Sequence, residues 1–118
     1  MYTINVTEKL QAGHKLTGYD GPCSRWHGHT WKVEVEIYGP SLDELNMLLD
    51  FRVIKDTIKA YDHQDLNDVC DVDCPTAEYL AKAIYDSLEL ICLHLPTSPH
   101  IDSVTVWESD NACVTYVK

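Results

Sequence analysis

The sequence lacks long apolar runs and has little positive charge. No run approaches the ~18 apolar residues of a transmembrane helix, and residues 1–8 have neither the basic nor the apolar region of a secretory signal. Nine Lys and Arg stand against nineteen Asp and Glu, which gives a formal net charge of −10. Such a charge opposes binding to nucleic acid or to an anionic membrane. We therefore expect a cytoplasmic protein with neither partner.

Several other signatures are missing. The five cysteines are odd in number and scattered, which is typical of reduced thiols rather than of a disulfide framework. No linker, repeat or low-complexity segment interrupts the 118 residues, so we expect a single domain over residues 1–118. The His-Glu-x-x-His pattern of zinc hydrolases is absent. The aspartate-rich stretch 62–73 lacks the alternate spacing and closing Glu of a calcium loop.

What the sequence does have is a cluster of metal-binding residue types near its start. Cys23, His27 and His29 follow His14 within sixteen residues. On a strand, residues two apart point to the same side, so an extended His27–His29 segment would present both imidazoles together. Three imidazoles suit a catalytic zinc, which keeps a fourth position open, and would leave Cys23 free as base or nucleophile. A closed structural site of all four residues is the other interpretation.

Alternation of apolar and polar residues predicts the strands. Residues 2–14 alternate, and residues 31–38 do so most clearly. Residues 104–108 and 113–117 are typical of a closing hairpin around Asp110 and Asn111.

Helical spacing and capping residues predict two helices between these pairs of strands. Asp50 is a suitable N-cap for a helix that carries apolar residues from Phe51 to Tyr61, and Thr76 for a second helix that begins after Pro75. The order ββααββ predicts an α+β domain with a four-stranded antiparallel sheet and both helices on one face. The open edges of such a sheet favour pairing with other subunits.

Several short motifs occur in an order and spacing that resemble one family. The sequence resembles the 6-pyruvoyl-tetrahydropterin synthase / 6-carboxytetrahydropterin synthase family over nearly the whole chain. The motifs are Ala12-Gly13-His14, Cys23-x-x-x-His27-Gly28-His29, Asp50-Phe51, Asp62-His63-x-x-Leu66-Asn67, Pro75-Thr76-x-Glu78 and Trp107-Glu108. One departure is Leu10-Gln11-Ala12-Gly13-His14, where the family often has Phe-x-Ala-Ala-His.

The resemblance implies a fold, a substrate and a set of roles. It implies the tunnelling fold, with subunits joined into a barrel and a homo-oligomer that is most simply a hexamer, and a pterin triphosphate, 7,8-dihydroneopterin triphosphate, as substrate. It also implies Zn²⁺ as cofactor. The implied zinc ligands are His14, His27 and His29, the implied catalytic residues are Cys23, Asp62 and His63, and the implied pterin anchor is Glu108.

The spacing of the cysteine motif separates branches of the family. Pyruvoyl-forming members usually have a longer segment between the Cys and His-Gly-His, and a folate-linked branch has Glu in place of the Cys. This chain has Cys23 and three residues before His27, as in the 6-carboxytetrahydropterin synthases of queuosine and 7-deazapurine synthesis. We therefore expect a zinc-dependent carbon–oxygen lyase. A pyruvoyl-forming enzyme and a non-catalytic zinc- or pterin-binding homologue are the alternatives.

Some of these residues have ordinary structural explanations as well. Without the resemblance, Asp62 and His63 are typical of a polar loop after a helix, and Glu108 of an exposed strand end. Trp26, Trp31 and Trp107 fit a hydrophobic core more readily than a stacking platform for a pterin.

Overall fold

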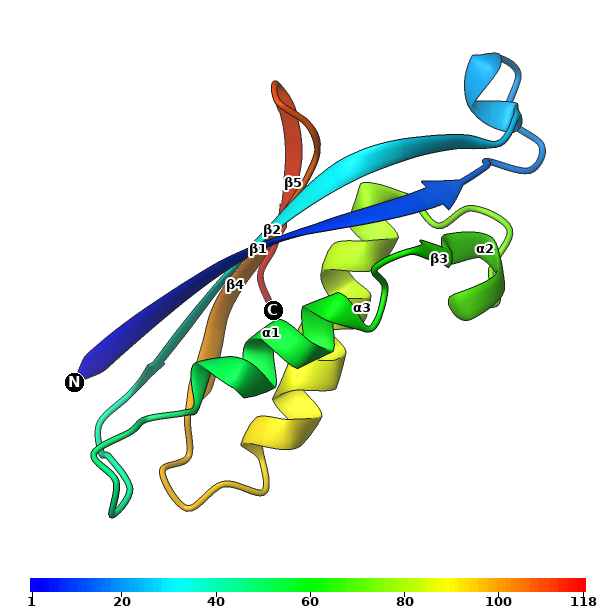
Figure 1. Ribbon diagram of the computed structural model, residues 1–118. Helices are drawn as coiled ribbons and strands as arrows, with labels where there is room; N and C mark the ends of the chain where they lie inside the picture. Colours follow the sequence, from blue (N-terminus) through cyan, green and yellow to red (C-terminus); the bar gives the residue numbers. More distant parts are fainter.

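The computed structural model describes all 118 residues as one sheet covered on one side by helices (Figure 1). The sheet has five strands in the order β3-β1-β2-β4-β5. Its elements in chain order are β1 (Tyr2–His14), the 3-10 helix η1 (Pro22–Ser24), β2 (His27–Gly39), α1 (Phe51–Lys59), β3 (Gln64–Asp65), α2 (Leu66–Val69), α3 (Ala77–Cys92), β4 (His100–Ser109) and β5 (Ala112–Tyr116).

The long β1–β2 hairpin organises the sheet. The two strands pair antiparallel over their full lengths, from Tyr2 opposite Gly39 to His14 opposite His27. Even-numbered residues of β1 and odd-numbered residues of β2 face the helices, and there Leu10 and Val35 are each 1% exposed. The alternation read from the sequence therefore continues unbroken to His27, and it carries His14, His27 and His29 onto the helix-covered face.

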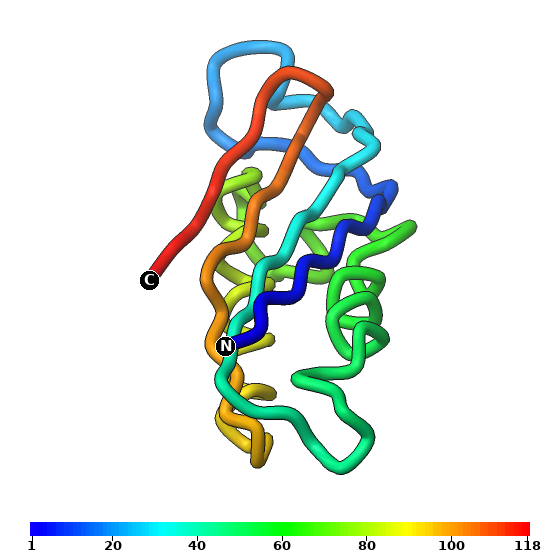
Figure 2. Tube along the Cα trace, turned by 90° about the vertical axis from the view of Figure 1, so that its left-hand side faces the viewer, coloured from blue at the N-terminus to red at the C-terminus, as the bar shows by residue number.

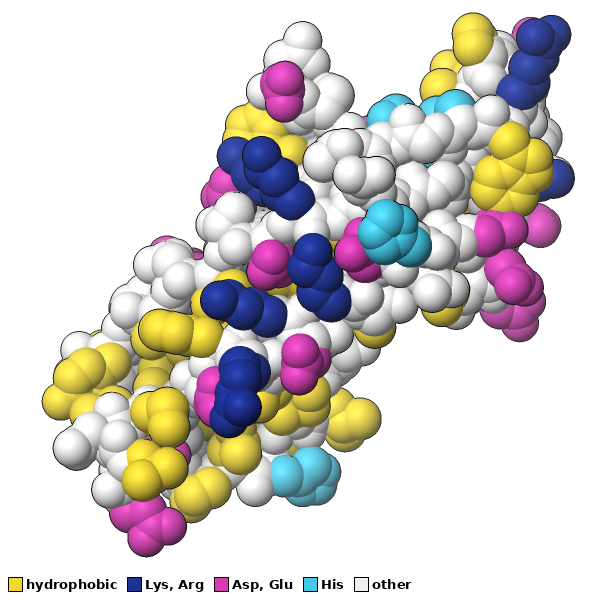
Figure 3. Space-filling view, viewed as in Figure 1, with side chains coloured by type: hydrophobic (Ala, Val, Ile, Leu, Met, Phe, Trp, Pro, Cys, Tyr) yellow, Lys and Arg dark blue, Asp and Glu magenta, His cyan; other side chains and the backbone are white.

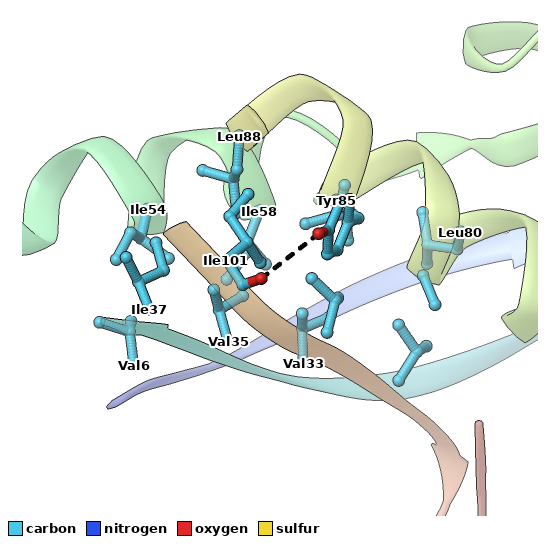
Figure 4. Close-up of a cluster of buried hydrophobic side chains, with 14 of the residues drawn as sticks. Val6, Val33, Val35, Ile37, Ile54, Ile58, Leu80, Tyr85, Leu88 and Ile101 are labelled. Carbon is cyan, nitrogen blue, oxygen red and sulfur yellow. Dashed lines mark hydrogen bonds between the residues drawn. The ribbon is translucent and has the colours of Figure 1, made fainter. Parts of the chain in front are cut away.

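Both predicted N-caps are present. The Asp50 side chain accepts a hydrogen bond from Arg52 N, and the Thr76 hydroxyl accepts one from Tyr79 N. The two helices cover one face of the sheet, and their apolar stripes meet its valines and isoleucines there (Figure 4). In this core the Tyr85 hydroxyl donates to the carbonyl of Ile101, so that the buried phenol is satisfied.

The segment between the two long helices differs from the prediction. The sequence predicts an acidic loop and four antiparallel strands, but residues 64–69 form β3, which pairs parallel to β1, and the short helix α2. Asp65 caps α2 by accepting from Asp68 N, and Leu66 is fully buried. A two-residue strand has no alternation to read, so only contact with β1 at Ala12 and Gly13 defines it. The sheet is therefore mixed and five-stranded.

The last hairpin is longer than expected on its first strand. Strand β4 begins at His100 rather than at Val104, and pairs with β2 from Tyr38 to Lys32. A register shift between Glu36 and Ile37 offsets the two ends of this ladder. This shift interrupts the alternation of apolar and polar residues along β4, so only residues 104–108 show it clearly in the sequence.

The molecule is longer and more exposed than a compact chain of its size. Its extents are 51 × 26 × 23 Å and its radius of gyration is 15.2 Å, against about 13.5 Å for a typical domain of this length. Its accessible surface of 7046 Å² exceeds the ~6,500 Å² expected from its mass. Figure 2 shows the strands next to one another, with the helices behind and beside them, and the loop after β1 and the β4–β5 turn at the same end. No helix is long and apolar enough to span a bilayer.

Candidate functional site

Three histidines converge at one end of the β1–β2 hairpin. His14 lies opposite His27 in the ladder, and His29 lies opposite Ala12 one step along the same face. The ring centroids are 4.6 Å apart for His14 and His27, 5.1 Å for His14 and His29, and 4.9 Å for His27 and His29. The predicted side-by-side placement of the three imidazoles is therefore present within one chain.

Backbone carbonyls set the orientation of two of these rings. His14 Nδ1 lies 2.8 Å from the Pro75 carbonyl oxygen, and His27 Nδ1 lies 2.7 Å from that of Arg25. A carbonyl only accepts, so each Nδ1 carries the proton and each Nε2 keeps a free lone pair. The Nε2 atoms of His14, His27 and His29 are all buried and have no hydrogen-bond partner. An unsatisfied buried polar atom is costly, and a metal ion shared by the three would satisfy them together.

Burial also keeps His29 in the form that binds metal. Desolvation lowers the pKa of His29, and the neighbouring His14 and His27 lower it further, against the opposing effect of the Glu108 carboxylate. A neutral imidazole is the metal-binding form.

Trp31 packs against the histidine cluster. It is fully buried, and its ring stands edge-on to the His14 and His29 rings, with centroids 5.0 and 5.2 Å away. Its Nε1 donates a hydrogen bond to the Ala12 carbonyl.

Glu108 reaches the same cluster from β4. Val104, Val106 and Glu108 share one parity, and both valines are fully buried on the helix-covered face. Glu108 Oε1 lies 2.9 Å from His29 Nε2 and 3.8 Å from His14 Nε2. The donor atoms of His14, His27, His29 and Glu108 all lie within 4.8 Å of one another. The sequence predicts Glu108 at a strand end but not this contact, although the shared parity with the two valines indicates the same face.

Cys23 lies outside this group of donor atoms. The cysteine sits in η1 on the loop between β1 and β2, is half-buried, and accepts a hydrogen bond from Leu16 N at its backbone carbonyl. The fourth donor atom near the three imidazoles is a carboxylate oxygen and not the thiol. This arrangement favours three histidine ligands with a separate cysteine over a closed site of one thiolate and three imidazoles.

Asp62 and His63 occupy the turn after α1, at the edge of β1. Asp62 Oδ1 accepts from Gln11 N at 2.7 Å, and His63 N donates to the Gln11 carbonyl. The Gln11 N–H lowers the pKa of the Asp62 carboxyl, and His63 and Lys59 lower it further. His63 has a φ of 57°, in the left-handed region that non-glycine residues rarely adopt. This bend brings His63 Nε2 to 3.7 Å from Asp62 Oδ2 although the two residues are adjacent in sequence.

His63 borders the open face of the sheet rather than the helix-covered one. A recess of about 420 Å³ is lined by His63 and Gln64, by Ala12 and His29, and by four open-face residues of the hairpin: Gln11, Gly13, Gly28 and Thr30. The His63 side chain is 77% exposed. The imidazoles of the histidine cluster point to the opposite face, so the chain alone does not direct the Asp62–His63 pair into the cluster.

Trp107 and Trp26 each have a local charged partner. Lys32 lies 3.3 Å from Glu34 Oε1 and over the Trp107 ring, and Trp107 Nε1 donates to the same carboxylate. Trp26 is half-exposed and Lys15 lies over its ring. Figure 3 shows basic side chains over α1 with acidic side chains among them. No separate cationic surface therefore stands out on this face.

Comparison with known sequences agrees with the motifs. A family model described as 6-pyruvoyl tetrahydropterin synthase matches residues 3–118. The 6-carboxy-5,6,7,8-tetrahydropterin synthase of Bacillus subtilis is 36% identical, over 98% of this chain and 84% of its own. The protein of the same name from Synechocystis is 30% identical, over 98% of this chain and 93% of its own.

Comparison with solved structures confirms the predicted fold. The 6-pyruvoyl tetrahydropterin synthase of Caenorhabditis elegans aligns with a TM-score of 0.75 at 20% identity, over 99% of this chain and 95% of that one. A 6-pyruvoyl tetrahydropterin synthase of Plasmodium vivax aligns with a TM-score of 0.62 at 16% identity, over 100% and 99%. These likenesses show the tunnelling fold of the single subunit.

Proposed function

The chain belongs to the 6-pyruvoyl tetrahydropterin synthase family, and from this premise we propose that it is a zinc-dependent 6-carboxy-5,6,7,8-tetrahydropterin synthase. The proposed reaction converts 7,8-dihydroneopterin triphosphate and one water to 6-carboxytetrahydropterin, with release of acetaldehyde and triphosphate. The observation that carries the proposal is the set of three buried, unpartnered Nε2 atoms of His14, His27 and His29. Relatives named 6-carboxytetrahydropterin synthase, each matched over 98% of this chain, support the choice of product.

The three histidines would hold the zinc ion. Their rings are oriented by packing and backbone contacts, so little ordering is needed when an ion binds. A bound Zn²⁺ supplies a Lewis acid that polarises the substrate's side-chain oxygens and stabilises negative charge as it develops there.

Proton transfer is the task of three further residues. Cys23, half-buried on the adjoining loop, is the proposed base that takes a proton from the substrate side chain next to the pterin ring. His63 is the proposed proton carrier, and the Asp62 carboxylate, whose Oδ2 lies 3.7 Å from His63 Nε2, would orient its ring. We propose that Asp62 and His63 act on a substrate held by a neighbouring subunit, since they border the open face of their own sheet.

Glu108 is the proposed pterin anchor. A carboxylate accepts two parallel hydrogen bonds from the pterin 2-amino group and N3–H, and this charge-assisted pair orients the ring. Because Glu108 lies beside His14 and His29, a pterin held by its carboxylate would bind close to the metal centre.

Product analysis by mass tests this proposal. Purified protein loaded with zinc and given 7,8-dihydroneopterin triphosphate should form 6-carboxytetrahydropterin, with one acetaldehyde per turnover in a coupled assay. Formation of 6-pyruvoyltetrahydropterin without acetaldehyde would instead establish the pyruvoyl-forming reaction. No product from a zinc-loaded protein that still binds pterin would establish a non-catalytic homologue.

A further inference from the structure

Glu108 is placed where a fourth ligand to the metal would lie. We propose that the Glu108 carboxylate binds the metal ion together with the three histidines in the free protein, and leaves it for the pterin when substrate binds. The second half of this proposal rests on the proposed function, because it takes a pterin as the molecule for which Glu108 leaves.

The spacing of the donor atoms carries the first half. Zinc binds nitrogen and oxygen at about 2.0–2.2 Å, so the donors of a tetrahedral site lie roughly 3.4 Å apart. Glu108 Oε1 lies 2.9 Å from His29 Nε2 and 3.8 Å from His14 Nε2, on either side of that value. All four donors fall within 4.8 Å of one another. The carboxylate is therefore at ligand distance from the histidines without any movement of the strands.

The contact between Glu108 and His29 is not a hydrogen bond. His29 Nε2 has no hydrogen-bond partner although the carboxylate oxygen is only 2.9 Å away. An ionised carboxylate has only acceptor sites. A cation bound by both His29 Nε2 and Glu108 Oε1 would give each atom a partner.

The backbone around Glu108 permits a second position. Glu108 is 35% exposed, and the β4–β5 ladder shifts register between Trp107 and Ser109. Such irregularities redirect a side chain at the end of a strand. The bidentate pterin contact uses both carboxylate oxygens, so Glu108 cannot serve the pterin and the metal fully at the same time. Pterin binding would thereby free a metal position for the substrate's side-chain oxygens.

Metal affinity tests the first position without any turnover. Wild-type protein and Glu108→Gln are each titrated with zinc against a competing chelator. We expect both proteins to bind about one zinc per chain, and Glu108→Gln to bind it at least ~10-fold more weakly. Loss of a residue that only hydrogen-bonds a metal ligand already weakens metal affinity by about that factor. Glu34→Gln is the matched control, because Glu34 is a strand carboxylate that contacts Trp107 on the other face and should leave zinc affinity unchanged.

Cobalt substitution tests the second position. The visible spectrum of the Co²⁺-loaded protein reports the number and type of ligands, and pterin without the triphosphate side chain serves as the probe. We expect pterin to change the wild-type spectrum toward that of Glu108→Gln and to leave the Glu108→Gln spectrum unchanged. If Glu108→Gln does not fold, Glu108→Asp provides the comparison, since it keeps the charge but withdraws the oxygens from the cluster.

The outcomes separate the two proposals. Equal zinc affinity and equal cobalt spectra for wild type and Glu108→Gln would overturn Glu108 as a ligand. A Glu108-dependent spectrum that pterin does not alter, with pterin binding shown by calorimetry, would overturn the second position. Failure of pterin to bind at all would overturn the proposed substrate and the second position, while the zinc titration still decides the first. Failure of product formation alone would count only against the proposed reaction.

Discussion

The histidine cluster and the Asp62–His63 pair are held in opposite ways. Each cluster Nε2 is buried, and two rings are oriented by carbonyls of Arg25 and Pro75. The pair stands at the edge of β1, where His63 is largely exposed and its backbone adopts an uncommon conformation. A left-handed non-glycine residue persists only where its surroundings require it, so this exposed turn is as specifically built as the buried cluster.

From this difference we infer that one half of the proposed site is complete within the chain and that the other half needs a neighbouring subunit. The elongated shape, the excess surface, the free edge of β5 and the part of β1 that β3 does not pair suit a chain that assembles with copies of itself. We propose a closed homo-oligomer, most simply a hexamer of two trimeric rings, in which the pair of one subunit faces the cluster of another.

Removing a cluster imidazole should have the largest effect. We expect His27→Ala to lose most of its zinc and nearly all activity, because two remaining imidazoles do not hold the metal in place. Metal analysis of the purified variants measures this, with His94→Ala, an exposed histidine after α3, as the control. Full zinc content in single variants of His14, His27 and His29 would contradict the ligand assignment.

Removing the cysteine should separate chemistry from metal binding. We expect Cys23→Ala to keep about one zinc per chain while kcat falls by ~10²–10⁴, the usual contribution of a general base. The exposed Cys113 on β5 supplies the control, as Cys113→Ala should retain both properties. Loss of zinc from Cys23→Ala would make the thiol a ligand and the centre a structural one.

Mixing two inactive variants tests whether the halves come from different subunits. Cys23→Ala and His63→Ala proteins, unfolded and refolded together, should regain activity, because roughly a quarter of the sites at subunit borders in a random closed assembly would combine two intact halves. Each variant refolded alone is the control. Mixed assemblies that stay inactive would place the whole site within one chain. A monomeric mass by light scattering would contradict the proposed closed homo-oligomer.

Neutralising Glu108 should weaken pterin binding more modestly. We expect Glu108→Gln to lose about 1.5–3 kcal/mol of pterin binding, the range for a hydrogen bond to a charged group. Calorimetry with pterin measures the loss, and the zinc content should stay near one per chain because the three histidines remain. An unchanged dissociation constant would remove Glu108 from the pterin site.

The smallest expected effect is on the pH dependence of stability. The Gln11 N–H, His63 and Lys59 lower the pKa of Asp62 in the folded state, so the ionised carboxylate stabilises the fold above its unfolded pKa of about 3.9. This stabilisation is lost as the pH falls from the unfolded-state pKa of Asp62 through its lower folded-state pKa. We expect wild type to be more stable than Asp62→Asn at pH 7, with the difference vanishing in acid, as measured by urea unfolding. Asp102→Asn, at an exposed position of β4, should show a smaller difference at pH 7.

The sequence by itself determined the long elements and the histidine pairing. Strict alternation marks β1 and β2, capping side chains mark α1 and α3, and residues two apart on a strand must share a face, so His27 and His29 were predictable as a pair. These are local properties, written within a few neighbouring residues.

Only the tertiary structure decided which distant residues join that pair. The full β1–β2 register brings His14 opposite His27, and the position of β4 beside β2 brings Glu108 to the cluster while Cys23 remains outside the donor group. The short β3 and the left-handed His63 likewise depend on contacts with Gln11 to Gly13 of β1. Most of these contacts join segments some 50 or more residues apart, as between Gln11 and Asp62. No local period in the sequence records them, because they arise only when the sheet is assembled.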